Sequence, residues 1–177
     1  AIIDAGIIGD PYSFIQGSAR GGNDIIIWPW RHYKNVGGIF VDAGVHAVDQ
    51  MMYYLGDIEE VFAVSKIWEP VRYRGDKIGV SNFYDHWADE VPESIKASSE
   101  DMVISTLKYK NGAIGQWTSF WAAHGEPIEY SMIYGSKGSM KPAKQRRGDP
   151  LSLNIDGIGE ITGQEVIDLV PDFHLDE

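Results

Sequence analysis

The sequence predicts an α+β fold, in which an open, mainly antiparallel sheet has helices packed on one of its faces. Two observations carry this prediction. The segment Gly37 to Asp57 has a helical period of apolar residues, whereas several segments elsewhere alternate as strands do. Asn111-Gly112, the strongest hairpin signal in the chain, lies between two of those strand-like segments. Strands joined by tight turns pair antiparallel, and a lone long helix must bury its apolar side on their sheet.

Glycine and proline residues separate the expected elements. Gly17 to Asp24 is a loop by composition, Pro29 should end any helix before Arg31, and Glu69 to Ile95 is expected to be irregular. We expect one main helix over Phe40 to Leu55. Strands are expected over Pro11 to Ala19, Ile58 to Trp68, Asp101 to Tyr109, Ala113 to Ala123, Pro127 to Tyr134 and Leu151 to Ile155.

The predicted helix carries two neighbouring stripes of side chains. The apolar stripe, which we expect to be buried, is Val41, Val45, Val48, Met52 and Leu55. The polar stripe repeats this spacing one residue later with Asp42, His46, Asp49 and Tyr53. Gly37 and Gly38 precede the helix and allow the backbone to approach another segment or a ligand, and Gly56 is suited to end it.

Composition excludes several classes of partner. The 177 residues suit one domain, and the net charge of -11 argues against nucleic acid and anionic membranes as partners. The chain has no cysteine, so disulfides and thiolate metal sites are impossible. It shows no membrane-span pattern and no signal-peptide pattern, which favours a soluble, cytoplasmic protein. A G-x-G-x-x-G after an N-terminal strand and a P-loop are both missing from these residues.

The polar stripe is the first candidate site. Asp42 and His46 are four residues apart, and a carboxylate beside an imidazole suits proton exchange near neutral pH. Asp49 can orient His46 or bind a substrate hydroxyl. The alternative is an ordinary surface ion pair, with Asp49 solvated. A metal held by these three side chains is a minor alternative, because nothing in the sequence specifies the further ligands.

A second group of candidates lies just before the glycine pair. Trp30 and Arg31 offer an aromatic face and a guanidinium, which suit sugar rings, hydroxyls and phosphates. The alternative is a tryptophan in the core and an arginine in a surface pair. Trp28 is a further pocket candidate, and Lys34, His32 and His124 are weaker ones.

Both faces of the central strands are apolar. Ala113 to Trp121 and Ile128 to Tyr134 place large side chains on either side of the sheet. One side is expected to pack on the helix. The other would form a large aromatic patch on a monomer, which monomers rarely expose. Self-association through that face is therefore expected.

Several motifs together resemble one family. They are GG-x3-D-x3-H-x2-D from Gly37 to Asp49, LGD-IEEVFAV from Leu55, the Trp30-Arg31 dipeptide, KNGAIG and YGSKGSM. In this order they resemble the C-terminal domain of the glucose-fructose oxidoreductase / inositol dehydrogenase / MocA-like (Gfo/Idh/MocA) oxidoreductases, from Ile7 to Pro142.

The resemblance implies a function. The family's aspartate and histidine, here Asp42 and His46, lie at the substrate against the nicotinamide, and the histidine exchanges the proton. Arg31 matches a further pocket position. Residues 1-177 are then a single substrate-binding and oligomerisation domain of an NAD(P)-dependent oxidoreductase that acts on a sugar, cyclitol or related polyol by hydride transfer. The alternative is a non-catalytic dimerisation module of the same fold.

The resemblance also implies what lies elsewhere. Family members begin with a Rossmann domain that binds NAD or NADP and carries a catalytic lysine in an E-K-P motif, and the sequence contains neither feature. We expect a domain truncated at the N-terminus and at the C-terminus, an inactive isolated chain, and a homo-oligomer formed through the sheet.

Overall fold

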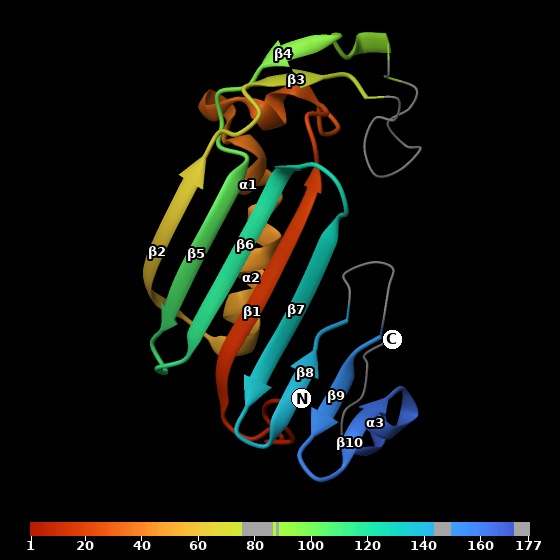
Figure 1. Cartoon of the computed structure of the whole chain (residues 1–177). Helices are drawn as coiled ribbons and strands as arrows, with labels where there is room; N and C mark the ends of the chain where they lie inside the picture. Colours follow the sequence, from red (N-terminus) through yellow and green to blue (C-terminus); the bar gives the residue numbers. More distant parts are fainter. Residues whose placement is uncertain (76–86, 88, 144–149, 172–177) are drawn as a thin grey trace.

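The computed structural model describes residues 1–75, 87, 89–143 and 150–171 (Figure 1). The strands are β1 (Pro11–Gly21), β2 (Ile58–Lys66), β3 (Val71–Tyr73), β4 (Ser94–Lys96), β5 (Met102–Tyr109), β6 (Ile114–Ala123), β7 (Ile128–Gly135), β8 (Gly138–Lys141), β9 (Ser152–Ile155) and β10 (Gly159–Thr162). Eight of them form one sheet in the order β10-β9-β8-β7-β1-β6-β5-β2. β1 runs parallel to β6 and antiparallel to β7, and the other neighbours in the sheet pair antiparallel. The predicted α+β class with a mainly antiparallel sheet is confirmed.

Helices cover one face of this sheet. The helical elements are η1 (Pro29–His32), η2 (Lys34–Val36), α1 (Gly38–Asp42), α2 (Gly44–Leu55) and α3 (Gln164–Asp168). α1 and α2 lie behind the sheet in Figure 1, while β3 and β4 form a small separate sheet near one end. Among the described residues, no helix has the length and apolar character needed to cross a membrane.

The strands expected from alternation are present with bounds shifted by one or two residues. The Asn111-Gly112 turn between β5 and β6 is also confirmed, since Gly112 has a φ of 86°. Asn111 Nδ2 donates to the Leu55 carbonyl at 3.0 Å, which ties this turn to the end of α2. The segment expected to be irregular contains β3 and begins β4, and its residues 76–86 and 88 lie outside the described part.

The prediction of one helix with an apolar stripe through Val41, Val45 and Met52 is wrong. The helix is interrupted at Ala43, and the side chains of these three residues are 68%, 53% and 42% exposed. The buried positions of α2 are Gly44, Met51 and Leu55. α2 approaches the sheet closely at Gly44, where a Cβ would lie 2.9 Å from the Trp117 ring. A small residue there turns the larger valines outward.

The two glycines before α1 allow another part of the chain to pack closely against the backbone, as the sequence predicts. Gly37 and Gly38 have φ values of 102° and 69°, which favour glycine, and Gly38 packs against the side chain of Ser99. The neighbour is therefore another segment of the chain.

The main core lies between α2 and the sheet. It joins residues from distant segments: Ile8, Phe14, Met51, Leu55, Leu107, Tyr109, Ile133, Met140 and Leu153 among others. On β5, Val103, Ser105, Leu107 and Tyr109 are buried toward this side, whereas Ile104 is 43% exposed on the other. We call this other side of the sheet the open face. Its exposed apolar side chains are Phe62, Val64, Ile104, Ile114, Ile128, Tyr130 and Tyr134.

Candidate functional site

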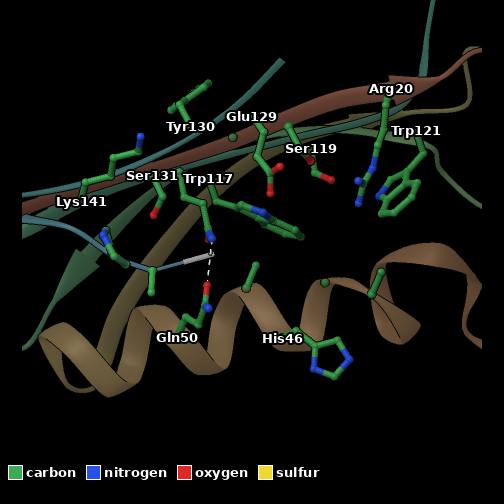
Figure 2. Close-up of a pocket in the computed structure, with 18 residues that line it drawn as sticks. Arg20, His46, Gln50, Trp117, Ser119, Trp121, Glu129, Tyr130, Ser131 and Lys141 are labelled. Carbon is green, nitrogen blue, oxygen red and sulfur yellow. Dashed lines mark hydrogen bonds between the residues drawn. The ribbon is translucent and has the colours of Figure 1, made fainter. Parts of the chain in front are cut away.

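A cavity of about 310 Å³ lies between α2 and the helix-facing side of the sheet (Figure 2). On the helix side its wall includes Ala43, Gly44 and Ala47. These side chains are too small to fill the space down to the strands. The cavity therefore exists because the residues that bring α2 close to Trp117 leave room beside it.

The floor of the cavity is polar because β1, β6 and β7 turn polar residues toward the helix. Ser18 of β1 lies opposite Ser119 on one side and Glu129 on the other. Gln16 lies opposite Trp117 and Ser131 in the same way. Alternation places all of these side chains on one face of the sheet. Such a floor provides both donors and acceptors for a hydroxyl-rich ligand.

One hydrogen bond bridges the floor and the helix. Gln16 Nε2 donates to Gln50 Oε1 at 3.0 Å (Figure 2). Gln16 Oε1 is buried and has no hydrogen-bond partner among the described residues. A buried acceptor without a donor is costly, and this oxygen is closed to solvent although other atoms of Gln16 line the cavity.

His46 is the predicted site residue that reaches the cavity. It lies in α2, lines the cavity and is otherwise exposed. Its ring makes no hydrogen bond or ion pair with other described residues. In Figure 2 the ring projects from the side of α2 that faces away from the labelled floor residues, so it lies at the edge of the cavity and is open to solvent.

Asp42 does not pair with His46. Arg31 Nη2 lies 2.8 Å from Asp42 Oδ2, and both side chains are largely buried. The Arg31 guanidinium also lies 5.5 Å from the centre of the Trp30 ring. The structure therefore brings Trp30, Arg31 and Asp42 together, as one group between η1 and α1. Asp42 ends α1 and His46 follows the interruption, so the expected single helical surface is broken between them.

Apart from His46, the predicted site residues do not line the cavity, and Trp30, Arg31 and Asp42 are among those that lie outside it. Asp49 is exposed on α2 and does not line it. Lys34 pairs with Glu100 at 3.2 Å, and His124 Nε2 lies 3.0 Å from Glu69 Oε1. The described residues contain no group of three or more His, Asp or Glu side chains that could hold a metal ion.

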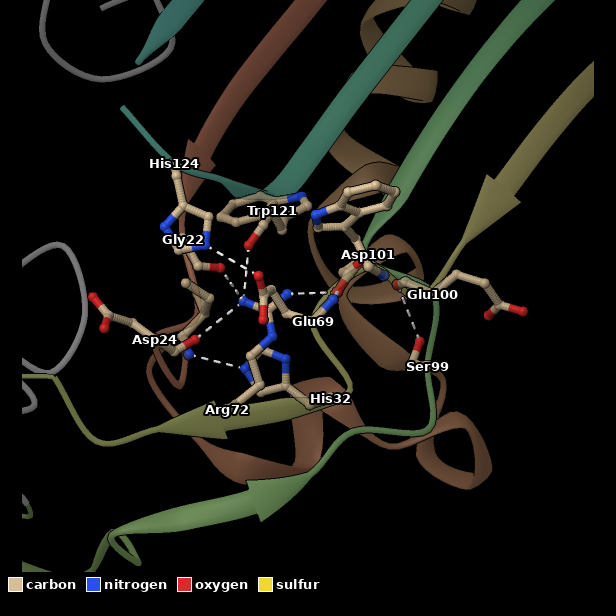
Figure 3. Close-up of polar contacts among 12 residues, drawn as sticks. Gly22, Asp24, His32, Glu69, Arg72, Ser99, Glu100, Asp101, Trp121 and His124 are labelled. Carbon is tan, nitrogen blue, oxygen red and sulfur yellow. Dashed lines mark hydrogen bonds and ion pairs between the residues drawn. The ribbon is translucent and has the colours of Figure 1, made fainter. Parts of the chain in front are cut away.

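His32 is buried next to a charged cluster. Its Nε2 accepts a hydrogen bond from the Ile26 amide at 2.9 Å, so the ring is neutral there (Figure 3). Burial, with Arg72 as the second cause, lowers the pKa of His32 to about 4. This histidine is a structural residue.

The polar floor was not predicted from the sequence. Arg20, Ser119, Trp121, Glu129, Ser131 and Lys141 line the cavity and were not predicted as site residues. The sequence does contain a sign of this polar floor, because Gln16, Ser18 and Arg20 occupy alternate positions of one strand. The large aromatic residues of β6 concealed it and led to the expectation that both faces are apolar.

An open sheet with a helix on one face and a polar cavity between them is the architecture of the second domain of a class of dehydrogenases. The family model of the GFO/IDH/MocA C-terminal domain matches residues 1–141. The chain belongs to the Gfo/Idh/MocA oxidoreductase family.

Similar proteins include levoglucosan dehydrogenase of Pseudarthrobacter phenanthrenivorans, 27% identical over 127 residues that cover 68% of this chain and 31% of that protein. A solved levoglucosan dehydrogenase in complex with NADH and L-sorbose is 25% identical, with a TM-score of 0.68 over 92% of this chain and 42% of that one. An NAD-binding oxidoreductase from Klebsiella pneumoniae, at 23% identity, shares the fold with a TM-score of 0.66 over 88% of this chain and 39% of its own. The chain thus spans less than half the length of these relatives.

Proposed function

We propose that this chain is the substrate-binding domain of a cytoplasmic NAD(P)-dependent oxidoreductase that acts on a sugar, cyclitol or related polyol by hydride transfer. The observation that carries the proposal is that His46 lines a polar cavity large enough for a small molecule. The levoglucosan dehydrogenase solved with NADH and L-sorbose supports this choice of cofactor and substrate class.

His46 is the proposed proton-transfer residue. When an alcohol loses a hydride to the nicotinamide, its hydroxyl proton must leave as well, and an imidazole accepts it near neutral pH. The ring of His46 is unpartnered among the described residues, so a substrate hydroxyl can approach it.

Asp42 and Arg31 are proposed to act as a unit. Asp42 Oδ2 is held by Arg31, which leaves Oδ1 for a substrate hydroxyl. Arg31 Nε is buried and has no hydrogen-bond partner among the described residues. Trp30, beside Arg31, adds an aromatic face, and Asp49 is a further possible ligand for a long substrate.

We propose that a separate nucleotide-binding domain of the full-length protein holds the cofactor. The outward side of α1 and α2 is the surface for that domain. Val41, Val45 and Met52 are exposed there although they are apolar, and they flank His46 in sequence. A nicotinamide brought to this side would lie near the exposed ring of His46.

The test is the steady-state turnover of the full-length protein with NAD or NADP and a panel of polyols. His46→Ala should lower kcat by about a hundredfold or more, because a general acid–base residue contributes that much. His124→Ala is the matched control, since His124 is exposed and outside the cavity, and it should turn over as the wild type does. Wild-type turnover of His46→Ala would remove His46 from the mechanism.

The open face is proposed to bind a second copy of the chain. Seven apolar side chains are exposed on it, from Phe62 at 73% to Tyr130 at 37%. This same observation supports the second candidate function, a non-catalytic dimerisation module. The two candidates differ in turnover: a module would associate, while neither the full-length protein nor its His46→Ala variant would oxidise any polyol.

A further inference from the structure

We propose that the β6 end of the cavity is a subsite for a carboxylate, and that Arg20 binds it. The ligand class is then a sugar acid or another polyhydroxy acid, with its hydroxyls on the remaining floor. This proposal rests on the proposed function, because it names the substrate class of the same cavity.

Arg20 is an exposed arginine at the β6 end of the cavity. Its guanidinium carbon lies 4.7 Å from the centre of the Trp121 ring, and both residues line the cavity (Figure 2). Among the described residues, Arg20 forms no ion pair, although Glu129 lines the same cavity. Its N–H groups have no hydrogen-bond partner among the described residues. Two parallel N–H groups of a guanidinium match the two oxygens of a carboxylate.

The remainder of the floor suits hydroxyl groups. Ser18, Ser119 and Glu129 lie side by side across three strands, next to Gln16 and Ser131. The carboxylate of Glu129 accepts hydrogen bonds from hydroxyls and disfavours a second carboxylate at its own position. A ligand that satisfies both ends carries hydroxyls near Glu129 and its charge near Arg20.

A buried network fixes the Arg20 end of the cavity. Arg72 Nη1 donates to the Trp121 carbonyl at 2.9 Å, and the Trp121 amide donates to the Asp101 carbonyl at 2.8 Å. Both main-chain groups of Trp121 are therefore held (Figure 3). Arg72 Nη1 also donates to the Gly22 carbonyl at 2.9 Å, which fixes the chain just after Arg20.

The same network explains why a glycine follows Arg20. Gly21 has a φ of 100°, and a Cβ there would lie 2.6 Å from the Trp121 carbonyl oxygen. The strand ends that carry Arg20 and Trp121 are thus pressed together and cross-linked by Arg72. Arg72 and Asp101 are positioning residues, and they reduce the ordering that a bound anion would otherwise require.

The local charge matters because the whole chain repels anions. Its net charge is -11, so an acidic ligand gains nothing from long-range attraction. A cation at the cavity must supply the attraction, and Arg20 lines its β6 end. A neutral sugar would not require it.

The experiment compares D-glucuronate with D-glucose, which differ in a carboxylate against a hydroxymethyl group. Both are titrated into the 177-residue chain by calorimetry, with amide and indole NMR shifts as a second readout. We expect wild type to bind glucuronate at least about tenfold more tightly, because a hydrogen-bonded charge pair is worth that much. Arg20→Gln should remove this preference and leave glucose binding unchanged, while Glu129→Gln should strengthen glucuronate binding.

Lys110→Ala is the matched charge control. It removes one positive charge from a surface pair with Asp57, outside the cavity, and should keep the preference. Equal binding of the two sugars by wild type, equal losses for both in Arg20→Gln, or no binding of either sugar would each overturn the subsite. Circular dichroism of each variant identifies a folding defect, and Arg20→Met then replaces Arg20→Gln with the same expected loss of preference.

The outcome is separable from that of the proposed function. Binding to the chain needs neither cofactor nor turnover. A preference for glucuronate that depends on Arg20, together with wild-type turnover in His46→Ala, would keep the subsite and reject the role of His46. If His46→Ala loses turnover but wild type shows no preference for glucuronate, the oxidoreductase function is kept and its substrate is a neutral polyol.

Discussion

Arg72 Nη2 and Asp101 Oδ2 lie 2.8 Å apart with both side chains closed to solvent, at 0% and 2% exposure. Lys110 and Asp57 have the same separation of 2.8 Å at the surface, where the side chains are 65% and 61% exposed. Equal distances thus describe two different interactions. Asp101 also accepts hydrogen bonds from the Trp68 and Glu69 amides at 2.7 and 3.0 Å.

Asp101→Asn should therefore lower the free energy of unfolding by about 3–5 kcal/mol, because it leaves the buried Arg72 charge uncompensated. Asp57→Asn should leave the free energy of unfolding nearly unchanged, because water and salt screen the surface pair. Urea denaturation of both variants measures the difference. Similar values for the two variants would show that burial of the Arg72 pair is incomplete in solution.

His32 should make the fold sensitive to acid. Its pKa is lowered to about 4 in the folded chain, whereas an unfolded histidine titrates near the ordinary value of 6.5. Below pH 6.5 the unfolded state binds more protons at this histidine than the folded state does. The stability that neutral His32 contributes is therefore complete above pH 6.5 and is lost as the pH falls toward 4. The loss amounts to about 3 kcal/mol over that window. Urea midpoints of wild type and His32→Gln from pH 7 to pH 5 should converge at the lower pH, and parallel curves would contradict the prediction.

Tyr109→Phe should stabilise the chain or leave it unchanged. The Tyr109 side chain is fully buried, its hydroxyl has no hydrogen-bond partner among the described residues, and burial raises the pKa of Tyr109 to about 12. Removal of an unsatisfied buried hydroxyl relieves a desolvation cost of about 1–3 kcal/mol. Thermal unfolding is the measurement. A clear fall in Tm would indicate that water or another group satisfies this hydroxyl in solution.

The Arg31–Asp42 pair should behave as one unit in the full-length protein. Because Arg31 Nη2 holds Asp42 Oδ2 at 2.8 Å, Arg31→Ala and Asp42→Asn should cause overlapping losses in kcat/KM. Each loss should be smaller than that of His46→Ala, since the imidazole remains in place. A double-mutant cycle tests this, and strictly additive losses would mean that the two residues act separately.

A charge on the open face should abolish self-association. Phe62 and Val61 are neighbours on β2 that point to opposite faces, at 73% and 59% exposure. Phe62→Lys places a charge on the open face and should yield a monomer in light scattering, whereas Val61→Lys should remain associated. A monomeric wild type at high concentration would reject the proposed interface.

The strands were predictable because alternation and the Asn111-Gly112 turn are local signals. The side of the helix that packs on the sheet was not, because it depends on Gly44 meeting Trp117, a contact between distant segments. The valines that suggested a buried stripe instead form an outward surface. β3 and β4 escaped prediction because strands of three residues are too short to show a period.

The candidate site was predicted in part for the same reason. His46 was found from its spacing within one helix. The partner of Asp42 is Arg31, which comes from another element, and the i, i+4 rule assumes an unbroken helix. Arg20 and Glu129 come together only when three strands pair, so no local pattern joins them.

The parallel pairing of β1 with β6 has a consequence for how the molecule assembles. β6 and β7 follow one another in sequence but do not pair, because the N-terminal strand β1 lies between them. The sheet is therefore completed only when a distant segment enters its middle, a pairing of high contact order that tends to form slowly. The strand that enters also carries Gln16, Ser18 and Arg20 into the cavity. A ligand held there would bind the completed sheet alone, and it would protect the chain from opening at its own first strand.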